Sequence, residues 1–211
     1  MKIMLFGPQG AGKGTIGNML SEEYHIPLLS AGQMLRDAMK ECTSVGKIAE
    51  KFINHGNFVP PEVISNVIKE RIQKKDCANG YILDGFPRNL KQAELFGERM
   101  DDIDYILELD APEELLIHRL TGRRTCRKCT AVYNIFPDCA PNPKKPGICD
   151  KCGGELYQRE DDTEDAIKKR LSLYHSETKP ILDKYKNRVT KIDATGNPDL
   201  IFERVLDVIG C

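Results

Sequence analysis

The stretch that decides the fold is KIMLFGPQGAGKGT, residues 2–15. Its first residues form a short apolar run, which is typical of a strand buried in a parallel sheet. The loop that follows has Gly7, four further residues and then Gly12 and Lys13, which is the spacing of a phosphate-binding loop. Glycines let backbone N–H groups surround phosphate oxygens, the next helix adds its dipole, and Lys13 supplies a mobile positive charge.

The residues after the loop favour this interpretation over a plain glycine-rich turn. Ile16, Met19, Leu20 and Tyr24 recur at the spacing of one helix face, so a helix begins near Lys13. A phosphate loop needs this strand before it and this helix after it. One departure is that glycine follows Lys13 where Ser or Thr is usual, and the threonine comes one residue later.

The rest of the chain alternates between apolar runs and helical patterns. Strands are predicted over 26–30, 81–86, 104–110 and 189–194, and helices over 31–41, 44–55, 61–74, 90–99 and 112–121. A helical stripe also runs from Ile167 to Tyr185, with a kink expected at Pro180. This alternation predicts an α/β fold, a three-layer sandwich whose central parallel sheet is covered by helices on both faces.

Composition narrows the class of protein. The 211 residues carry a net charge of −1, so no overall basic field points to a nucleic acid or a membrane surface. The apolar start, residues 1–6, is too short for a signal peptide or a membrane span. Eight cysteines without an export signal favour reduced thiols, some of them bound to metal, and therefore the cytoplasm.

Residues 122–159 interrupt the alternation with four prolines, four glycines and no helical period, so they are interpreted as an inserted module. The insertion contains two CxxC pairs, Cys126 with Cys129 and Cys149 with Cys152, separated by nineteen residues. This is the pattern of a closed tetrahedral zinc site. A thioredoxin-like redox pair would need a single CxxC at the start of a helix. A module of about forty residues cannot bury a real core, and metal binding can replace that core. The remaining cysteines, Cys42, Cys77, Cys139 and Cys211, are expected to be buried or inert, with Cys139 a weak candidate for a substitute ligand.

A second candidate site is LDGFPR, residues 83–88, at the end of a predicted strand. Ligands bind at the carboxyl ends of strands in open α/β sheets. Asp84 could orient water bound to magnesium, and Arg88 could hold a phosphate with two hydrogen bonds. The alternative is a capping aspartate and a surface arginine. Arginines also recur where a phosphate enzyme would need them, although each one alone could be a solvated surface charge. They are Arg36, Arg119, Arg123, Arg159 and Arg170.

Together the motifs GPQGAGKGT, SAGQMLR, LDGFPRNLKQAE, GRR and QREDD resemble adenylate kinase, in the same order and over nearly the whole chain. The resemblance implies a core of residues 1–29, 60–121 and 160–211. It also implies a helical monophosphate-binding domain, residues 30–59, and a zinc-binding lid, residues 122–159, that closes over ATP.

The same resemblance implies roles for single residues. The catalytic charges are Lys13, Arg88, Arg123, Arg159 and Arg170. ATP is bound by Gly10, Ala11, Gly12, Lys13, Gly14, Thr15, Arg119 and Arg123. The acceptor is bound by Ala31, Arg36, Gly85, Arg88, Gln92, Arg159 and Arg170, with Gln92 reading the base. Arg119, Arg123, Arg159 and Arg170 gather around the transferring phosphoryl group. Asp84 orients Mg²⁺-bound water, Asp161 and Asp162 hold arginines when the lid is shut, and Cys126, Cys129, Cys149 and Cys152 bind Zn²⁺.

Departures from the family pattern concern the acceptor. The family usually has Ser-Thr-Gly-Asp where this chain has SAGQ, so Ala31 cannot donate a hydroxyl hydrogen bond and Gln33 replaces a carboxylate. Gln9 also stands where proline is common. The expected reaction is MgATP plus AMP giving two ADP, by a monomer. The close alternative is a UMP/CMP-type kinase, because alanine at this position resembles those relatives. A zinc-ribbon nucleic-acid-binding ATPase is disfavoured by the near-neutral charge and the few aromatic residues in the insertion.

Overall fold

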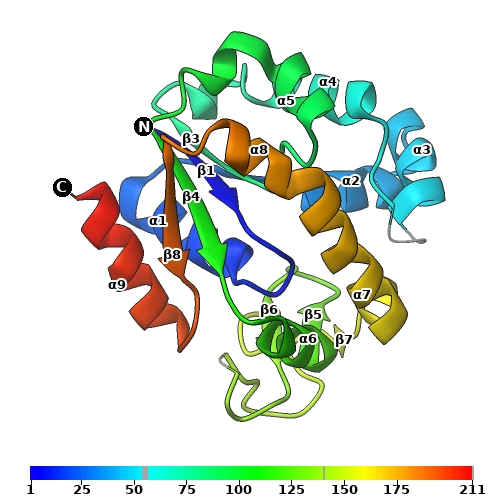
Figure 1. Ribbon diagram of the computed structural model, residues 1–211. Coiled ribbons are helices and arrows are strands. Elements are labelled where there is room, and N and C mark those ends of the chain that lie inside the picture. Colours follow the sequence, from blue (N-terminus) through cyan, green and yellow to red (C-terminus); the bar gives the residue numbers. More distant parts are fainter. Residues whose placement is uncertain (54–56, 140, 211) are drawn as a thin grey trace.

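A computed structural model describes residues 1–53, 57–139 and 141–210. Within these residues the main sheet has five parallel strands in the order β2-β3-β1-β4-β8, covered by helices on both faces (Figure 1). The predicted three-layer α/β fold is therefore confirmed. The strands are β1 (Lys2–Phe6), β2 (Leu28–Ser30), β3 (Tyr81–Asp84), β4 (Tyr105–Asp110) and β8 (Val189–Asp193).

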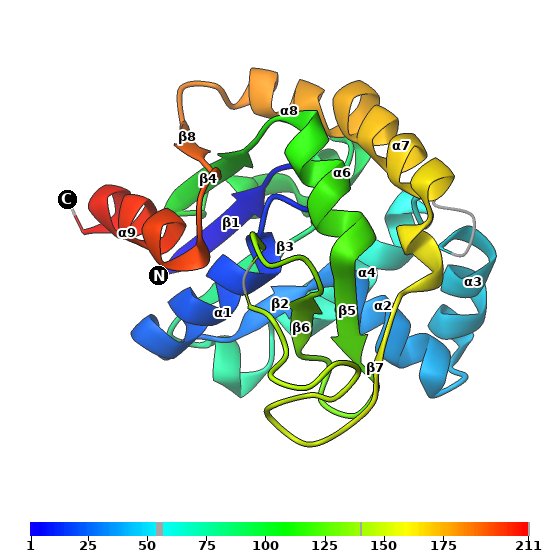
Figure 2. The ribbon, with the colours of Figure 1, turned by 90° about the horizontal axis from the view of Figure 1, so that it is seen from below.

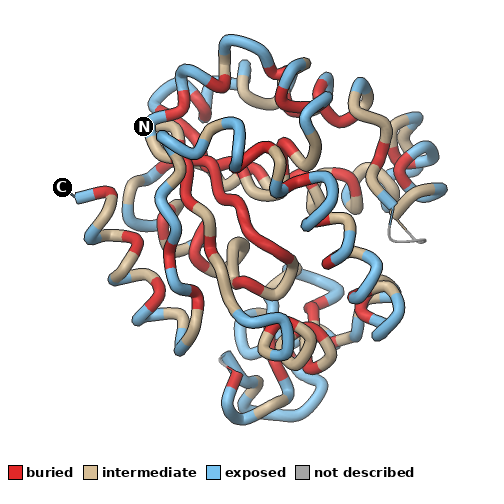
Figure 3. The backbone as a smooth tube through the Cα atoms, in the orientation of Figure 1, coloured by how far each residue is buried: buried red, intermediate tan, exposed pale blue. Residues whose placement is uncertain are grey.

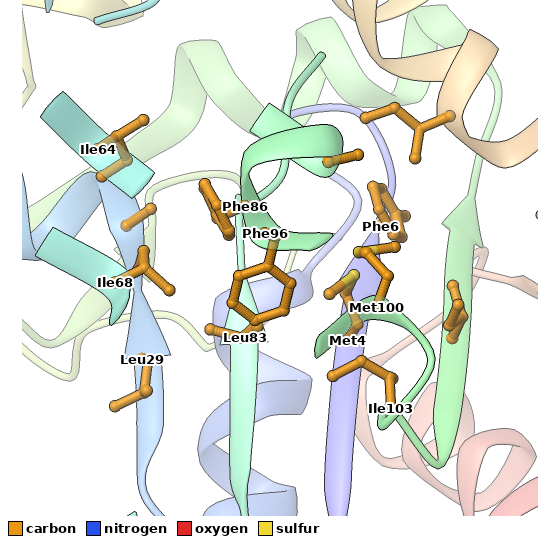
Figure 4. Close-up of a cluster of buried hydrophobic side chains, with 14 of the residues drawn as sticks. Met4, Phe6, Leu29, Ile64, Ile68, Leu83, Phe86, Phe96, Met100 and Ile103 are labelled. Carbon is orange, nitrogen blue, oxygen red and sulfur yellow. The ribbon is translucent and has the colours of Figure 1, made fainter. Parts of the chain in front are cut away.

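The side chains of the central strand alternate between two apolar layers. Ile3 and Leu5 belong to one buried cluster, together with residues of α1 (Lys13–Tyr24), α6 (Glu113–Gly122), α7 (Glu164–Leu173) and α9 (Pro198–Ile209). Met4 and Phe6 belong to the other, together with residues of α4 (Pro61–Arg71) and α5 (Leu90–Phe96) (Figure 4). Figure 3 shows that burial follows the central strands, whereas the outer helix surfaces are exposed. This double covering explains why the central strand β1 is apolar from Ile3 to Phe6 rather than alternating.

Several elements end earlier than the pattern predicts. β3 stops at Asp84 because Gly85 has φ of 74°, outside the strand region. The helix predicted over 61–74 ends at Arg71, and the one predicted over 90–99 ends at Phe96, where a 3₁₀ turn, η2 (Gly97–Met100), follows. The helix predicted over 44–55 is α3 (Ser44–Ile53), and residues 54–55 lie outside the described residues.

The helical stripe near the C-terminus is divided in two. α7 runs directly into a π-helical turn, η4 (Tyr174–Thr178), and then into α8 (Lys179–Lys184), which carries Pro180 in its first turn. Proline has no N–H to donate to the preceding turn, which interrupts the regular hydrogen bonding of the helix there. A kink was expected at Pro180, and the structure has a π-helical turn directly before α8, the helix that carries this residue.

Two additions lie beside the core, at the carboxyl ends of the strands. α2 (Ala31–Lys40) packs on α3, and both fall within the predicted monophosphate-binding domain. In residues 122–159, called the lid insertion below, the described part forms an antiparallel sheet, β6 (Val132–Asn134), β5 (Arg123–Cys126) and β7 (Leu156–Tyr157), seen from below in Figure 2. Figure 1 shows this sheet beyond the carboxyl ends of β1, β4 and β8. The domain boundaries stay predictions. Two further 3₁₀ turns are η1 (Lys75–Cys77) and η3 (Glu160–Asp162). No helix in the described ranges has the length and apolarity to cross a bilayer.

Candidate active site

The loop after β1 has the backbone of a phosphate cradle. Gly7 has φ of 137°, and a Cβ at this position would lie 2.3 Å from the Leu109 carbonyl oxygen, so only glycine fits. Gly12, also in the left-handed region, precedes the first residue of α1. Lys13 Nζ donates to the carbonyl oxygens of Gly7 and Pro8 at 2.7 and 2.8 Å. The lysine therefore lies folded back across the loop, with its charge at the carboxyl edge of the sheet.

The surroundings of Lys13 favour an anionic partner. Burial lowers the pKa of Lys13 to about 8, because the ammonium group has lost its water, and Asp84 offsets this only in part. The positive charges of Arg88, Arg170 and Arg123 lower the same pKa further. A phosphate oxygen beside Nζ would reverse the effect of these arginines.

The end of β3 places the second motif next to the loop. In the sheet register Leu5 of β1 lies beside Asp84, so the strand end that carries the acid is adjacent to the start of the phosphate loop. Asp84 Oδ2 accepts a hydrogen bond from Ser30 Oγ at 3.1 Å, which connects the carboxyl ends of β2 and β3. Arg88 Nε donates to the Gly85 carbonyl oxygen at 2.9 Å, which holds the arginine over the strand end.

Five arginines meet above these strand ends, from α2, the segment after β3, β5, the residue before η3 and α7. A Cβ built on Gly32 would lie 3.3 Å from Arg36 Nη1 and 3.7 Å from Arg88 Nη2, so both guanidinium groups lie close to the first turn of α2. Burial lowers the pKa of Arg159 to about 9, with Arg123 and Arg36 adding to the effect, and burial lowers that of Arg170 to about 10, where Arg123 and Arg88 add to it. The pKa of each of these arginines is lowered in part by the charges of others in the same group, so we treat the residues as one cationic cluster. Its members are Lys13, Arg36, Arg88, Arg123, Arg159 and Arg170.

Three carboxylates lie among these charges. Asp162 accepts from Arg123 through both oxygens, with 2.8 Å between Nε and Oδ2, and Arg170 Nη1 lies 2.9 Å from Asp161 Oδ2. Asp84 is the third. Six cations against three carboxylates leave an excess of three positive charges among the described residues of the site. Like charges held this closely and out of water destabilise the free protein, and bound phosphate groups would neutralise them.

Arg119 does not belong to this group. It donates from Nη1 to the carbonyl oxygens of Gly10, at 3.4 Å, and Ala194, at 3.0 Å, and from Nη2 to that of Gly196, at 3.0 Å. Burial lowers its pKa, and the titratable group that acts on it is the Cys139 thiol, not another arginine. In this structure α6 directs Arg119 to the outer side of the phosphate loop, apart from Arg123, Arg159 and Arg170, and its predicted role stays a prediction.

A small pocket lies between α2, α4 and the end of β3. Arg88 forms its polar end, and its guanidinium lies 5.4 Å from the ring centre of Phe58, at cation–π distance. Apart from Arg88 and Gln92 the lining is apolar or glycine, which suits the flat faces of a base. It consists of Ala31, Gly32, Leu35, Phe58, Val59, Ile64, Gly85, Arg88 and Gln92. Sequence reasoning missed Leu35, Phe58, Val59 and Ile64; the segment FVPPE, residues 58–62, has no chemical signature of its own.

Gln92 and Ala31 are both buried in this lining. Gln92 Oε1 accepts from the backbone N–H of Arg88 at 2.7 Å, and its own N–H donates to Asn89 Oδ1, the N-cap of α5. Ala31 is the first residue of α2. Gln33 links Arg36, whose Nη2 donates to Oε1 at 3.2 Å, to Asp37, which accepts from Nε2 at 2.8 Å. A larger, open pocket at the ends of β4 and β8 contains no member of the cationic cluster. It is lined by Asp110, Ala111, Pro112, Lys191, Asp193 and Thr195.

The four predicted cysteine ligands come together in the lid insertion. Their sulfur atoms lie within 4.8 Å of one another, with 3.5 Å for the pairs Cys126–Cys152 and Cys129–Cys149. A tetrahedral zinc with bonds of about 2.3 Å requires sulfurs about 3.8 Å apart, so the arrangement fits that ion. A Cβ on Gly154 would lie 2.9 Å from Cys126 Sγ, so the chain passes the cluster where only glycine fits. The buried apolar cluster of the insertion contains, besides Cys126 and Cys149, only Tyr133 and Leu156 within the described part.

Comparison with known proteins agrees with this geometry. The family model for adenylate kinase matches residues 5–190. The chain belongs to the adenylate kinase family. It is 47% identical to the adenylate kinase of Syntrophobacter fumaroxidans, over all of both chains, and 44% identical to that of Streptomyces coelicolor, over 99% of this chain and 98% of the relative. The adenylate kinase of Archaeoglobus fulgidus is 45% identical over 95% of this chain and 93% of its own.

Membership of this family confirms the expected reaction class and accounts for the surplus of positive charge. An adenylate kinase brings two anionic nucleotides together and transfers a phosphoryl group between them. Such a transfer depends on positioning and charge neutralisation more than on a covalent catalyst. Cations from α1, α2, the segment after β3, β5 and α7 lie at one strand edge, which suits that requirement.

Proposed function

We propose a division of tasks among the residues of the site in the family's reaction, the reversible transfer of a phosphoryl group from MgATP to AMP to give two ADP. The observation that carries the proposal is the cationic cluster with its excess of three positive charges over Asp84, Asp161 and Asp162. The triphosphate of ATP and the phosphate of AMP, placed end to end, provide the missing negative charge.

On the donor side, the loop amides of residues 10–15 and Lys13 bind the ATP phosphates. Lys13 exchanges its contacts with the Gly7 and Pro8 carbonyl oxygens for phosphate oxygens, which raise its pKa again. Arg119 supports the outer side of the loop through the Gly10 carbonyl oxygen and completes the ATP site there. Mg²⁺ bound with ATP neutralises phosphate charge, and Asp84 orients its water.

On the acceptor side, Arg36 and Arg88 hold the AMP phosphate. Their convergence over Gly32 supports this assignment, since two guanidinium groups this close need an anion between them. The base enters the apolar pocket beside Phe58. Gln92 Oε1 is already bonded to the Arg88 N–H, so its amide nitrogen is the atom that donates to the base.

Arg123, Arg159 and Arg170 act on the transferring group. Arg123 and Arg170 are bonded to Asp162 and Asp161, which fix their positions before substrate arrives. Charges that are already in place cost little reorganisation in the transition state. Arg159 is bonded through Nε to Thr125 Oγ1 at 2.9 Å, so a strand of the lid insertion positions it.

The four-cysteine cluster holds a structural zinc ion. The support is the sulfur geometry together with the very small apolar core of the insertion. With four thiolates the ion has no open position for catalysis. We also propose that the enzyme acts as a cytoplasmic monomer. Every group assigned above comes from a single chain, and eight cysteines suit a reducing compartment.

A coupled assay of ADP formation tests this assignment, with ATP and, in turn, AMP, CMP, UMP or no acceptor. Wild type should form ADP fastest with AMP and only slowly without acceptor. Lys13→Ala should lower kcat by at least about 10²-fold, the usual loss when a positioned charge is removed from a transition state. Lys47→Ala, an exposed lysine on α3, is the matched control and should keep its activity. Near wild-type turnover by Lys13→Ala would refute the role of the loop.

A further inference from the structure

A second group of metal-ligand side chains lies where the lid insertion meets α6. His118 projects from α6, and Asp138 and Cys139 belong to the loop after β6. The three ligand atoms lie within 4.8 Å of one another, and His118 Nε2 is 2.9 and 3.1 Å from the two Asp138 oxygens. This group shares no residue with the four-cysteine cluster, and none of the roles proposed above uses it.

The surrounding contacts hold this arrangement without any ion. The ring of Phe136 stacks on that of His118 with 4.4 Å between centres and 7° between planes, which fixes the imidazole orientation. Asn142 Nδ2 donates to the carbonyl oxygens of Asn134, Phe136 and Cys139 at 2.9, 2.6 and 3.0 Å. Asn134 Nδ2 donates in turn to the Arg119 carbonyl oxygen at 2.8 Å, which ties the loop to α6. Preorganised donors are the main structural requirement of a metal site.

The donor set determines which ion would bind. An imidazole nitrogen, a carboxylate oxygen and a thiolate sulfur together favour a borderline divalent cation, with Zn²⁺ foremost, over Mg²⁺ or Ca²⁺. Two of the three side chains are accessible from solvent, 41% exposed for His118 and 66% for Asp138, whereas Cys139 is buried behind them. An ion can therefore enter from outside and reach the sulfur.

We infer that His118, Asp138 and Cys139 form a second binding site for a divalent cation of the zinc type, with a fourth position left for water. On binding, the S–H bond of Cys139 breaks, its proton passes to water and a metal–sulfur bond forms. His118 coordinates through Nε2 and keeps its proton on Nδ1. One thiolate and one carboxylate neutralise the divalent charge, so the loaded site is neutral overall, next to Arg119, whose field reaches Cys139.

An ion at this site would cross-link the core to the lid insertion. His118 lies in α6, a helix assigned to the core, whereas Asp138 and Cys139 belong to the loop that follows β6 in the lid insertion. This site should bind the ion much more weakly than the four-cysteine site, because three mixed ligands with an open position bind less tightly than four thiolates. The second ion would therefore be the one that exchanges first.

A cobalt titration of the full-length, metal-stripped and reduced protein tests the inference. Co²⁺ absorbs in the visible range when tetrahedral and shows a sulfur charge-transfer band for each thiolate bound. We expect two Co²⁺ per chain, the first with the intense band of four thiolates and the second, weaker one with the band of a single thiolate. His118→Gln and Asp138→Asn alter exposed side chains, and each should weaken the second equivalent at least tenfold and leave the first unchanged.

The matched controls are His175→Gln and Cys42→Ser, an exposed histidine and an exposed cysteine outside the site, which should keep both equivalents. Cys139→Ser should remove the single-thiolate band, and if it does not fold, the two exposed variants still decide. One Co²⁺ per chain in wild type, with His118 and Asp138 acting only as an ion pair, would overturn the inference. So would a second equivalent that is unaffected by His118→Gln and Asp138→Asn.

Discussion

Arg123, at the start of the lid insertion, and Asp162, 39 positions later, form a two-point ion pair in which the Asp162 side chain is completely buried. The pair joins the two ends of the insertion, where it leaves and re-enters the core. Arg170 Nη1 lies 3.6 Å from the same carboxylate, so one acid holds two of the proposed catalytic arginines. The stability of the insertion and the geometry of the site therefore depend on one side chain.

Asp162→Asn should lower the free energy of unfolding by about 3–5 kcal/mol, the usual cost of removing one partner from a buried pair. The remaining guanidinium groups would repel one another with less compensation. Denaturant unfolding of the metal-loaded protein measures the change. Asp183→Asn, an exposed aspartate on α8, is the control and should change stability by no more than about 0.5 kcal/mol. Equal stability of the two variants would show that Asp162 does not hold the insertion.

The low pKa of Lys13 predicts proton uptake when ATP binds. Burial lowers this pKa to about 8 in the free protein, and a bound phosphate raises it. Between pH 8 and the higher pKa of the complex, binding should therefore take up a proton, and Kd for ATP should rise by up to about tenfold per pH unit. Below pH 8 the lysine is already charged, and its effect disappears. Calorimetry at pH 9 in buffers of different ionisation enthalpy measures the uptake.

Lys13→Arg is the control for this titration, because the guanidinium stays charged in the free protein. It should bind ATP without the proton uptake. An unchanged uptake in Lys13→Arg would assign the proton to another group.

Ala31→Thr should favour AMP over CMP and UMP. Ala31 is buried in the lining of the acceptor pocket, and the added hydroxyl would place a hydrogen-bonding group beside the base. One hydrogen bond contributes about 0.5–1.5 kcal/mol, so the ratio of kcat/KM values should change by at most about tenfold. Ala31→Val adds the same bulk without the hydroxyl and separates the two effects. If Val and Thr change the ratio equally, bulk and not hydrogen bonding sets base preference at this position.

Removal of the lid metal should lower stability and leave the chemistry possible. Cys149→Ser with Cys152→Ser leaves two thiolates, which cannot close a tetrahedral site. We expect a lower Tm and loss of the tightly bound ion, with kcat largely retained at temperatures where the protein stays folded, because the proposed catalytic charges lie outside the cluster. Metal analysis, thermal unfolding and the coupled assay measure the three quantities, with Cys42→Ser as the control. Complete loss of activity in folded protein would contradict a purely structural metal.

Sequence reasoning located the features whose determinants lie close together along the chain. The phosphate loop needs a strand, glycines at fixed offsets and a helix start, all within residues 2–15, and the structure has them. The two CxxC pairs could be recognised because the turn within each pair is local. The buried strands β1 and β3 were likewise recognisable, because burial on both faces requires continuous apolar runs. Element ends were less certain, as Gly85 shows by ending β3 two residues early.

Tertiary structure alone decided which side chains meet. Arg119 and Arg123 lie four residues apart, but α6 turns the first toward the Gly10 carbonyl oxygen and β5 directs the second to Asp162. Phe58 reaches Arg88, and His118 reaches Asp138, only through the packing of segments remote in sequence. Periodicity and spacing determine local backbone conformation. Convergence of side chains depends on strand register and on how helices pack across the sheet, and these are set by the sum of many long-range contacts.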